Sequence, residues 1–509
     1  MLHRRHLPLL APSALGLPAL RPARAETAAR IALLHLNDFH SRHEPIAATT
    51  AACRPAEACF GGSARIAGAL RAAREEAAAE GRATLTLEAG DAFLGSLFFT
   101  HHRGLAEAAA QRGWGTQAFA LGNHEFDLGP GVLAAYAAAV DFPILAANLA
   151  TAAEPDLARR IRPWAEFRLG GARVAVLGLV TTDTPGISSP GPNLRFTDPA
   201  EATARAIREA RRDGPATVVV LSHLGIGADR RLAAEVPGVD VIVGGHSHTL
   251  LAGPAHPTVL EGRDRPVRMV QAGAFGRWAG RLDLDLRADG AVNAHGGAIR
   301  ELGADTPEDP AMREVVARLA APLQALRRQA VGHLPAALPN LSCGAGPCEL
   351  GRLVAEAMRQ AAGAEIGWQN GGGLRAGLPG GVVTLEDVLT TLPFANTLAR
   401  ITLRGGDLLA ALENGVSRLP QPSGRFPQTA GLRFAVEAAR PAGQRVTSAE
   451  VEEAPGDWRP LDPARAYSIA TNSFLRRGGD GYAAFAQRVL ESRDDGPLIE
   501  DALIAWLRR

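Results

Sequence analysis

The sequence contains no lysine, so its 54 lysine-plus-arginine residues are all arginines. This absence excludes mechanisms built on a lysine side chain, among them a P-loop phosphate site, a Schiff base and a serine–lysine dyad. Any phosphate group that this chain handles must therefore be bound by arginine, by backbone amides or by a metal ion.

Excess charge and long apolar runs are lacking as well. The formal net charge of the 509 residues is +1, which offers no electrostatic reason to expect a nucleic-acid polymer as a partner. After the N-terminal segment no apolar stretch approaches the roughly 18 residues that a membrane-spanning helix needs. We therefore expect no membrane insertion of the mature chain. Nothing in the sequence indicates an oligomeric state.

The N-terminus has the pattern of an export signal. Arg4 and Arg5 precede an apolar stretch over residues 7–20, and the ARA at 23–25 resembles a small-residue cleavage site. We predict a signal peptide over residues 1–25 and a periplasmic or secreted mature protein. The paired arginines leave the twin-arginine route open beside ordinary secretion.

Cysteine is scarce, with four residues in two close pairs: Cys53 with Cys59, and Cys343 with Cys348. In an exported protein such local pairs usually close small loops as disulfides. A zinc site of four thiolates is the alternative, although neither pair has the C-x2-C spacing typical of zinc ligands. We favour two disulfides.

The abundant residues indicate an α/β fold. Hydrophobic residues make up 46% of the chain, and 509 residues are too many for one core, so two domains are expected. From about residue 28 to 287, apolar runs alternate with helical stretches such as 62–81. Such runs suit strands covered on both faces in a layered α/β architecture. They are ARIALLHL, ATLTLEA, TQAFALG, FPILAAN, ARVAVLGLV, ATVVVLSHL, VDVIVGG and VRMVQAG.

The pattern changes near residue 304. Residues 304–330 carry acidic side chains early and arginines late, which suits the dipole of a single helix. We predict an N-terminal domain over 28–303, a linker helix over 304–331 and a second α/β domain over 332–509.

Polar side chains follow several predicted strands at the points where the strands end. In open α/β sheets ligands bind beyond the carboxyl ends of the strands, so we expect these side chains to converge in one crevice. Taken singly, each could be an ordinary buried histidine or turn residue. Together they form the carboxylate, imidazole and amide set of a hydrolytic divalent-metal centre. The set is Asp38, His40, Asp91, Asn123, His223, His246 and His248.

This set is too large for one ion and indicates two. Two cations about 4 Å apart need a shared anion to offset their repulsion. Asp91, directly after Gly90, is the natural bridge. We expect the ions to generate hydroxide by lowering the pKa of water from about 15.7 toward 7, and the hydroxide to attack a phosphoryl group.

The ordered motifs D-x-H, GD, GNHE, H and GH-x-H resemble those of the calcineurin-like metallophosphoesterases. NDFH, GNHEFD and GGHSH are similar to the 5′-nucleotidase family, which includes periplasmic UDP-sugar hydrolases. QNGGGLR, LPFAN and NSFLRRGGDGY extend the resemblance through the C-terminal half. The resemblance implies a layered α/β metallophosphoesterase sandwich as the catalytic domain, joined by a helix to a 5′-nucleotidase-type substrate-binding domain.

The resemblance also implies how the two ions are held. One would be bound by Asp38, His40, Asp91 and His248, and the other by Asp91, Asn123, His223 and His246. Zn²⁺ and Mn²⁺ are the preferred candidates. Several relatives have Gln or Asn where this chain has His248, a departure expected to change the metal preference.

His124 and Asp127 are implied as the catalytic pair. His124 would stabilise charge on the phosphoryl group or the leaving oxygen, and Asp127 would orient its ring. Glu125 and Phe126, which lie between them, are expected to be structural.

In the C-terminal domain the resemblance implies a nucleotide site. Arg375 would be aimed at phosphate, and Phe394 and Phe474 would stack on the two faces of the base. The other expected contacts are Asn370, Asn396 and Asp480.

One motif departs from the family pattern. Relatives carry one or two arginines in the segment that corresponds to SCGAGPCELGRL, whereas no arginine lies between Cys343 and Cys348. Loss of a charge-assisted contact should weaken phosphate binding by about 1.5 to 3 kcal/mol. Arg352, Arg476 or Arg477 is expected to compensate, or the preferred substrate is not a plain nucleoside monophosphate.

We therefore expect an exported phosphohydrolase of 5′-nucleotides, with UDP-sugars and cyclic nucleotides as further candidate substrates. One alternative is a thiosulfohydrolase of sulfur oxidation on the same scaffold, and another is a non-catalytic nucleotide- or metal-binding protein. Phe394, Phe474 and Asp480 favour nucleotides over the first alternative. The complete ligand set with His124 and Asp127 argues against the second.

Overall fold

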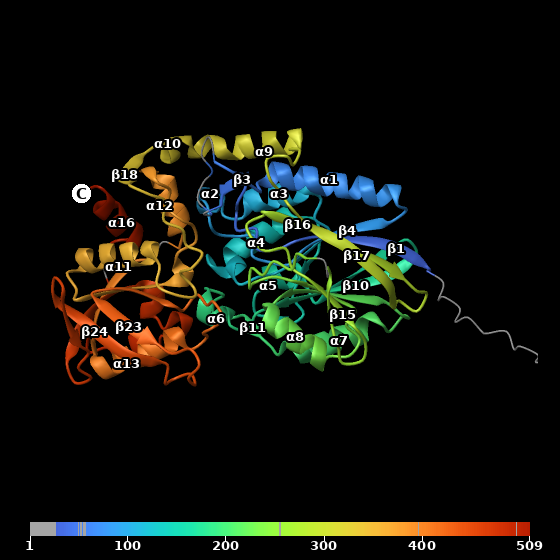
Figure 1. The fold of residues 1–509 in the computed structure, drawn as a ribbon. Coiled ribbons are helices and arrows are strands. Elements are labelled where there is room, and N and C mark those ends of the chain that lie inside the picture. The colour runs from blue at the N-terminus through green and yellow to red at the C-terminus, as the bar shows by residue number, and fades with distance from the viewer. Residues whose placement is uncertain are drawn as a thin grey trace, which may run out of the picture.

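The computed structural model describes residues 27–48, 50, 53, 57–253, 256–394, 396–494 and 496–509. The predicted signal peptide, residues 1–25, lies outside these ranges. The described chain forms two bodies, the first coloured blue to green and the second orange to red, with the helices α9 and α10 running between them (Figure 1).

The N-terminal body is built on two sheets that pack face to face. One sheet has the strand order β17-β16-β1-β4-β5-β6-β8 and the other β14-β15-β13-β12-β10-β9. Apolar side chains of both sheets form one shared core. The first sheet comprises β1 (Ala29–Leu36), β4 (Ala83–Glu88), β5 (Ala118–Ala120), β6 (Ile144–Leu145), β8 (Ile161–Arg162), β16 (Trp278–Leu286) and β17 (Val292–Glu301). The second comprises β9 (Trp164–Leu169), β10 (Ala172–Val180), β12 (Thr217–His223), β13 (Val241–Gly244), β14 (Thr258–Leu260) and β15 (Val267–Val270).

Helices cover the outer faces of both sheets. A core cluster joins β1 to α1 (Ser63–Ala79), α3 (Leu105–Trp114) and α9 (Pro310–Ala320), and another joins β10 and β12 to α7 (Pro199–Ala210) and α8 (Ile226–Glu235). The result is the layered α/β sandwich predicted from the apolar runs. The remaining elements of this body are β2 (Ile46–Ala47), β3 (Cys59–Phe60), α2 (Leu97–His102), η1 (His124–Phe126), α4 (Gly129–Ala139), β7 (Leu149–Ala150), α5 (Pro155–Ala158), α6 (Thr184–Ile187) and β11 (Arg195–Phe196).

Each apolar run predicted as a strand contains one. ARIALLHL coincides with β1 and ARVAVLGLV with β10. The strands of the two large sheets that were not predicted are mostly antiparallel ones such as β9 and β16. β16 alternates buried and half-buried residues over RLDLDL, because one of its faces is less covered, so it lacks the continuous apolar run used to find the others.

The connection between the bodies is not the single helix expected over 304–330. Asp309 caps α9 by accepting from the amide of Met312 at 2.9 Å, so the helix begins only at Pro310. The α-helix then gives way at Pro322 to the 3-10 turn η2 (Ala321–Leu323) and the short α10 (Gln324–Arg327). Proline lacks the amide hydrogen needed to continue the ladder. The strand β18 begins at Ala330.

The C-terminal body has a central sheet in the order β22-β19-β26-β21-β27. α11 (Glu349–Ala362) and α16 (Ile499–Leu507) contribute to one core, and α13 (Gly405–Val416) and α15 (Ala483–Gln487) to another. The strands of the sheet are β19 (Ile366–Asn370), β21 (Leu398–Arg404), β22 (Pro427–Ala430), β26 (Ala466–Asn472) and β27 (Glu491–Arg493). The rest are β18 (Ala330–Leu334), η3 (Gly371–Gly373), β20 (Gly381–Thr384), α12 (Leu385–Thr391), β23 (Leu432–Val436), β24 (Val446–Ala454), β25 (Asp457–Pro460), α14 (Ser473–Arg476) and η4 (Gly479–Gly481).

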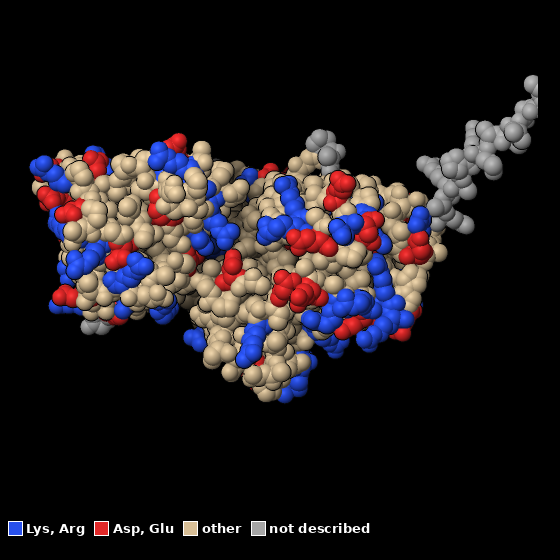
Figure 2. All heavy atoms as spheres, turned by 90° about the horizontal axis from the view of Figure 1, so that it is seen from below, with Lys and Arg blue, Asp and Glu red and all other residues tan. Residues whose placement is uncertain are grey.

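Both predicted disulfides are present, Cys53–Cys59 and Cys343–Cys348. Because every thiol is thereby used, the alternative of a four-thiolate zinc site is wrong. In the described ranges, no helix is both long and apolar enough to span a bilayer. Acidic and basic side chains are intermixed over the face shown in Figure 2, in keeping with the net charge of +1.

Candidate metal centre and substrate site

The predicted metal ligands lie where parallel strands of the two sheets end. β1 runs parallel to β4, and β12 runs parallel to both β10 and β13. Because the sheets pack face to face, these carboxyl ends meet at one edge of the sandwich. Asp38 and His40 follow β1, Asp91 follows β4, Asn123 follows β5, His223 ends β12, and His246 and His248 follow β13.

The predicted ligands converge in two groups, and a third set joins two of them, His40 and Asp91, to His124. Ligand atoms of Asp38, His40 and His248 lie within 4.8 Å of one another, as do those of Asp91, His223 and His246. His223 Nε2 is 3.1 Å from Asp91 Oδ2, and His248 Nε2 is 3.3 Å from Asp38 Oδ1. Asp91 Oδ2 is also 3.9 Å from His40 Nε2, so this carboxylate lies between the groups.

Orphaned atoms show that the donors fit divalent cations. Asn123 Oδ1 is buried without a hydrogen-bond partner among the described residues, and the closest charged contact of His223 Nε2 is the one with Asp91 Oδ2, as expected of atoms that can turn to an ion. Nδ1 of His223 lies 2.6 Å from the Ala89 carbonyl and Nδ1 of His40 lies 3.2 Å from the Phe93 carbonyl. These contacts leave Nε2 of each ring facing the cluster, which is how metal-binding histidines are usually oriented.

The backbone at the cluster is strained. Asp38, His40, Asp91, His246 and His248 all have positive φ, between 50° and 70°. Such a conformation costs a non-glycine residue about 1 kcal/mol or more, and it is concentrated at functional sites. The surrounding packing therefore holds these side chains in place against a local preference.

Glycines beside the ligands permit the close approach. A Cβ at Gly122 would lie 2.2 Å from Asp91 Oδ1, and one at Gly245 would lie 2.4 Å from the Ala89 carbonyl oxygen. The glycines of the GNHE and GGHSH motifs are thus needed because side chains there would displace neighbouring ligands.

Two residues of the motifs hold the ligand loops without facing the cluster. Asn37, which the sequence analysis did not assign, donates from Nδ2 to Asp38 Oδ2 at 2.7 Å and to the Gly273 carbonyl at 2.6 Å. The Glu125 carboxylate accepts backbone amide hydrogens from Gly122, Asp91, Ala92 and Phe93 at 2.6–3.2 Å. The expectation that Glu125 is structural is confirmed. The position of Asn37 directly before Asp38 in the NDFH motif could have indicated this role from the sequence.

Burial and the neighbouring charges shift the pKa values of the cluster residues in both directions. Burial alone would raise the pKa of Asp91, but His223 and His124 outweigh it and hold that pKa well below its usual value. Burial lowers the pKa of His223, yet Asp91 and Asp38 overcome this effect and raise it to about 10. Burial and then His223 lower the pKa of His246 to about 4.

The predicted catalytic pair is in contact. His124 Nδ1 lies 2.6 Å from Asp127 Oδ2, and the His124 amide donates to Asp91 Oδ1 at 2.9 Å. Burial opposes protonation of His124, but Asp127 and Asp91 raise its pKa. Ser188 donates to Asp127 Oδ1 at 2.7 Å. The sequence analysis missed Ser188 because it lies far along the chain in no recognisable motif.

Two predicted substrate residues of the C-terminal body reach the metal cluster. Arg375 Nη2 lies 3.2 Å from His40 Nε2, and the Phe394 ring centroid is 5.9 Å from that of His124. Burial lowers the pKa of Arg375 against the opposing effect of Asp91.

The remaining predicted substrate residues lie together on the C-terminal body. Asn370 Nδ2 donates to Asp480 Oδ2 at 2.7 Å. Asn396 Oδ1 accepts from Ser473 Oγ at 3.0 Å, next to Phe474. Burial raises the pKa of Asp480 against the Asn370 hydrogen bond and nearby Arg425, a residue that the sequence analysis did not consider.

Not all of the arginines suggested as replacements for the missing phosphate-binding arginine are free to take that role. Arg476 donates to Asp494 Oδ1 and to the Phe485 carbonyl, each at 3.0 Å. Arg352 is an exposed residue of α11. Neither has a described contact with the metal cluster or with Arg375.

Together the four-layer sandwich and the Asp/His cluster at its strand ends define a metallophosphoesterase. The family model described as "Calcineurin-like phosphoesterase" matches residues 31–250, and that described as "5'-nucleotidase, C-terminal domain" matches residues 330–487. A solved structure of a 5′-nucleotidase precursor from Thermus thermophilus is 37% identical, with a TM-score of 0.88 over 94% of this chain and 96% of that one.

Sequence relatives carry the same name. The 5′-nucleotidase of Bos taurus is 33% identical over 94% of this chain and 87% of its own length. The trifunctional nucleotide phosphoesterase YfkN of Bacillus subtilis is 33% identical over 81% of this chain, which spans only 31% of that longer protein. The chain belongs to the 5′-nucleotidase family of phosphoester hydrolases. A sulfate thiohydrolase of Thermus thermophilus, at 21% identity and a TM-score of 0.77, shares the fold alone.

Proposed function

We propose that this protein is an exported hydrolase that removes phosphate from 5′-nucleotides with two divalent metal ions. The observation that carries the proposal is the meeting of Arg375 with the candidate metal cluster, 3.2 Å from His40. An arginine from one body thereby faces the ligands of the other. This arrangement brings a phosphate-binding side chain to the cluster, where it would meet a phosphoryl group bound to the ions.

The ligand assignment follows the two groups of side chains. Asp38, His40, Asp91 and His248 would hold one ion and Asp91, Asn123, His223 and His246 the other, with Zn²⁺ or Mn²⁺ as the preferred identity. When bound, the ions lower the pKa of a water molecule and offset phosphoryl charge.

The protein's own side chains orient the substrate. His124, fixed by Asp127 through Nδ1 at 2.6 Å, directs Nε2 toward the cluster and would donate to a phosphoryl or leaving oxygen. Arg375 would hold a phosphoryl oxygen. Phe394 and Phe474 would stack on the base while Asn370, Asn396 and Asp480 bind the nucleoside.

This proposal assigns residues 28–303 to catalysis, 304–331 to the connection and 332–509 to substrate binding. Export is supported by the two disulfides, since such bonds persist in oxidising compartments. UDP-sugars and cyclic nucleotides are further candidate substrates.

A substrate panel on protein of measured metal content tests the proposal. We expect phosphate release from AMP, abolished by chelation and by Asp91→Asn. His124→Ala should retain both metals while kcat falls by about 10²- to 10⁴-fold. Loss of a metal from this variant would make His124 a ligand. Sulfate release from a thiosulfonate substrate, with no action on AMP, would favour the thiosulfohydrolase alternative.

Phe474→Ala separates nucleoside binding from phosphate chemistry. The variant should have a raised KM for AMP, since a base-stacking contact is worth about 1 to 3 kcal/mol, and an unchanged KM for a small aryl phosphate. Equal losses on both substrates would show that the ring does not stack on the base.

A further inference from the structure

Polar side chains from outside the segment hold the chain that carries Arg375. Arg42 Nη2 donates to the Arg375 carbonyl at 2.9 Å. Asn340 Nδ2 donates to the Leu374 carbonyl at 2.9 Å, and the Gly377 amide donates to Thr50 Oγ1 at 3.3 Å. These bonds fix the backbone on both sides of the arginine.

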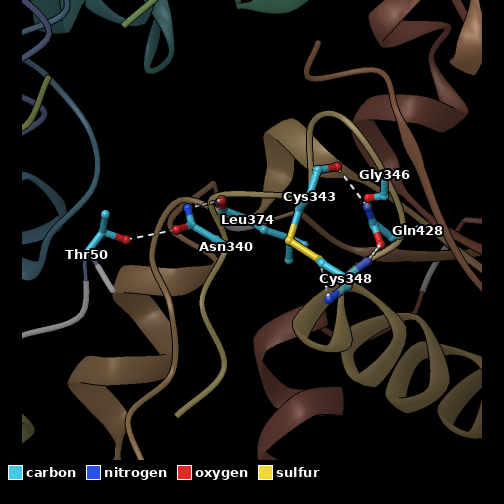
Figure 3. The surroundings of a disulfide bond; sticks show 8 residues. Thr50, Asn340, Cys343, Gly346, Cys348, Leu374 and Gln428 are labelled. Atoms are coloured by element: carbon cyan, nitrogen blue, oxygen red, sulfur yellow. Dashed lines mark hydrogen bonds between the residues drawn. A yellow bond between two sulfur atoms is a disulfide. The ribbon is translucent and has the colours of Figure 1, made fainter. Parts of the chain in front are cut away.

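Two of these contacts cross from the N-terminal body. Besides accepting from Gly377, Thr50 donates from Oγ1 to Asn340 Oδ1 at 2.9 Å, which completes a path from Thr50 through Asn340 to Leu374 (Figure 3). Asn340 is itself steadied by the disulfide loop, because its carbonyl accepts the Cys343 amide at 3.0 Å.

Arg42 is a buried cation, and its burial costs free energy that a purely structural role does not explain. The residue is 3% exposed, and none of the described carboxylates forms an ion pair with it. Its guanidinium lies 5.4 Å from the Phe275 ring, and its Nε is buried without a partner. Burying a cation without a counter-charge is unfavourable, so its contact with the Arg375 carbonyl calls for a functional reason.

Phosphate binding by this chain depends strongly on the position of the Arg375 guanidinium. No arginine lies between Cys343 and Cys348, so one expected arm of the phosphate clamp is absent. The remaining guanidinium reaches within 3.2 Å of His40 Nε2. A misplacement of about 1 Å near a reacting group can cost about 10²-fold in rate.

We propose that Arg42, Thr50 and Asn340 form an interdomain latch that seats Arg375 over the metal centre. The inference rests on the proposed function, in which Arg375 binds phosphate. The latch residues are positioning residues. They act on the Arg375 backbone and not on the substrate.

Substitution of single latch residues tests the proposal. Arg42→Met, which loses one hydrogen bond to the segment, and Thr50→Val, which loses two, should each lower kcat/KM for AMP about three- to tenfold, with metal content unchanged. Thr50→Ser keeps the hydroxyl and should restore the rate. Loss of metal from Arg42→Met, or a failure of Thr50→Ser to recover, would overturn the latch.

Glu44→Gln is the matched control. Glu44 pairs with Arg327 at 2.7 Å near the same junction but does not contact the Arg375 segment. This variant should keep the wild-type rate. A loss equal to that of Thr50→Val would mean that any disturbance of the junction lowers the rate, which contradicts a specific latch.

A double-mutant cycle shows whether the latch acts through Arg375. In an Arg375→Met background, Thr50→Val should cause no further loss, because the side chain that it positions is gone. Additive losses would overturn the proposal.

Hydrogen exchange provides a readout that needs no activity. Amides of residues 371–377 should exchange faster in metal-loaded Thr50→Val than in the wild type or in Glu44→Gln. Unchanged exchange would overturn the latch even if nucleotides are hydrolysed. Faster exchange in a protein that releases no phosphate from AMP would contradict the proposed function and leave the latch contacts supported.

Discussion

His35, on β1, is a buried imidazole, and neither of its ring nitrogens has a hydrogen-bond partner among the described residues. It lies opposite Gly280 on β16, where a Cβ would come within 1.9 Å of its Nε2. Burial and then His256 lower its pKa from 6.5 to about 3. The ring therefore stays neutral in the folded protein down to about pH 3, whereas in the unfolded chain it is charged below about pH 6.5.

His35→Leu should make the protein less sensitive to acid. Between pH 6.5 and 3 the unfolded chain binds a proton at His35 that the folded chain does not, so folding stability falls as the pH is lowered through this window. At pH 4.5 the loss is roughly 2 to 3 kcal/mol. Urea unfolding at pH 7 and pH 4.5 should show a smaller drop for this variant than for the wild type.

The exposed His333 on β18 offers the control. His333→Leu should leave the acid dependence of the wild type unchanged. If the stability of His35→Leu falls between pH 7 and pH 4.5 as much as that of the wild type, the acid sensitivity has other causes, such as the carboxylates of the metal cluster.

At the scale of elements, the turn η3 and the disulfide loop form one unit. A Cβ on Gly371 would lie 2.2 Å from the Cys343 carbonyl oxygen. Gln428 Nε2 donates to the Cys343 and Gly346 carbonyls at 2.8 Å, and its Oε1 accepts the Cys348 amide at 2.9 Å (Figure 3). Gly371 therefore lets the NGGGLR turn pack against this loop, and that packing positions the backbone that leads to Arg375.

Gly371→Ala should disturb substrate binding more than folding. The added methyl group forces η3 and the Cys343 backbone apart, so we expect KM for AMP to rise by about tenfold with both metals retained. Gly346→Ala is the control, since nothing lies within 4 Å of its Cβ position. A normal KM in Gly371→Ala would mean that this contact does not control the loop.

On the scale of the whole molecule, metal binding should stabilise one body more than the other. The proposed ligands all belong to the N-terminal body. Each ion that binds only the folded cluster adds about 2.7 kcal/mol at a hundredfold excess over Kd. A shift of this size corresponds to roughly 5 to 10 °C in the melting temperature of a domain of this size.

Removal of metal with a chelator should therefore lower the melting temperature of the N-terminal body, and Zn²⁺ or Mn²⁺ should restore it. Calorimetry on the full chain measures the effect. Asp91→Asn should show a smaller shift on chelation. An equal shift in this variant would place the stabilising ions elsewhere.

The sequence alone determined most of the buried parallel strands of the N-terminal body and the edge at which their ligands lie. Both are local properties: an apolar run marks a buried strand, and the polar residues after it lie at the strand's carboxyl end. Since β1, β4, β12 and β13 are held parallel within their sheets, motifs such as NDFH and GGHSH were enough to predict which side chains converge.

Only the tertiary structure decided how the two bodies meet. The contact of Arg375 with His40 joins residues 335 positions apart, and the bonds of Arg42 and Thr50 to the Arg375 segment span 333 and 327 positions. The same is true of Ser188 with Asp127, 61 positions apart. Such contacts depend on how separately folded surfaces pack. The hydrophobic periodicity of one segment does not indicate which other surface that segment will contact.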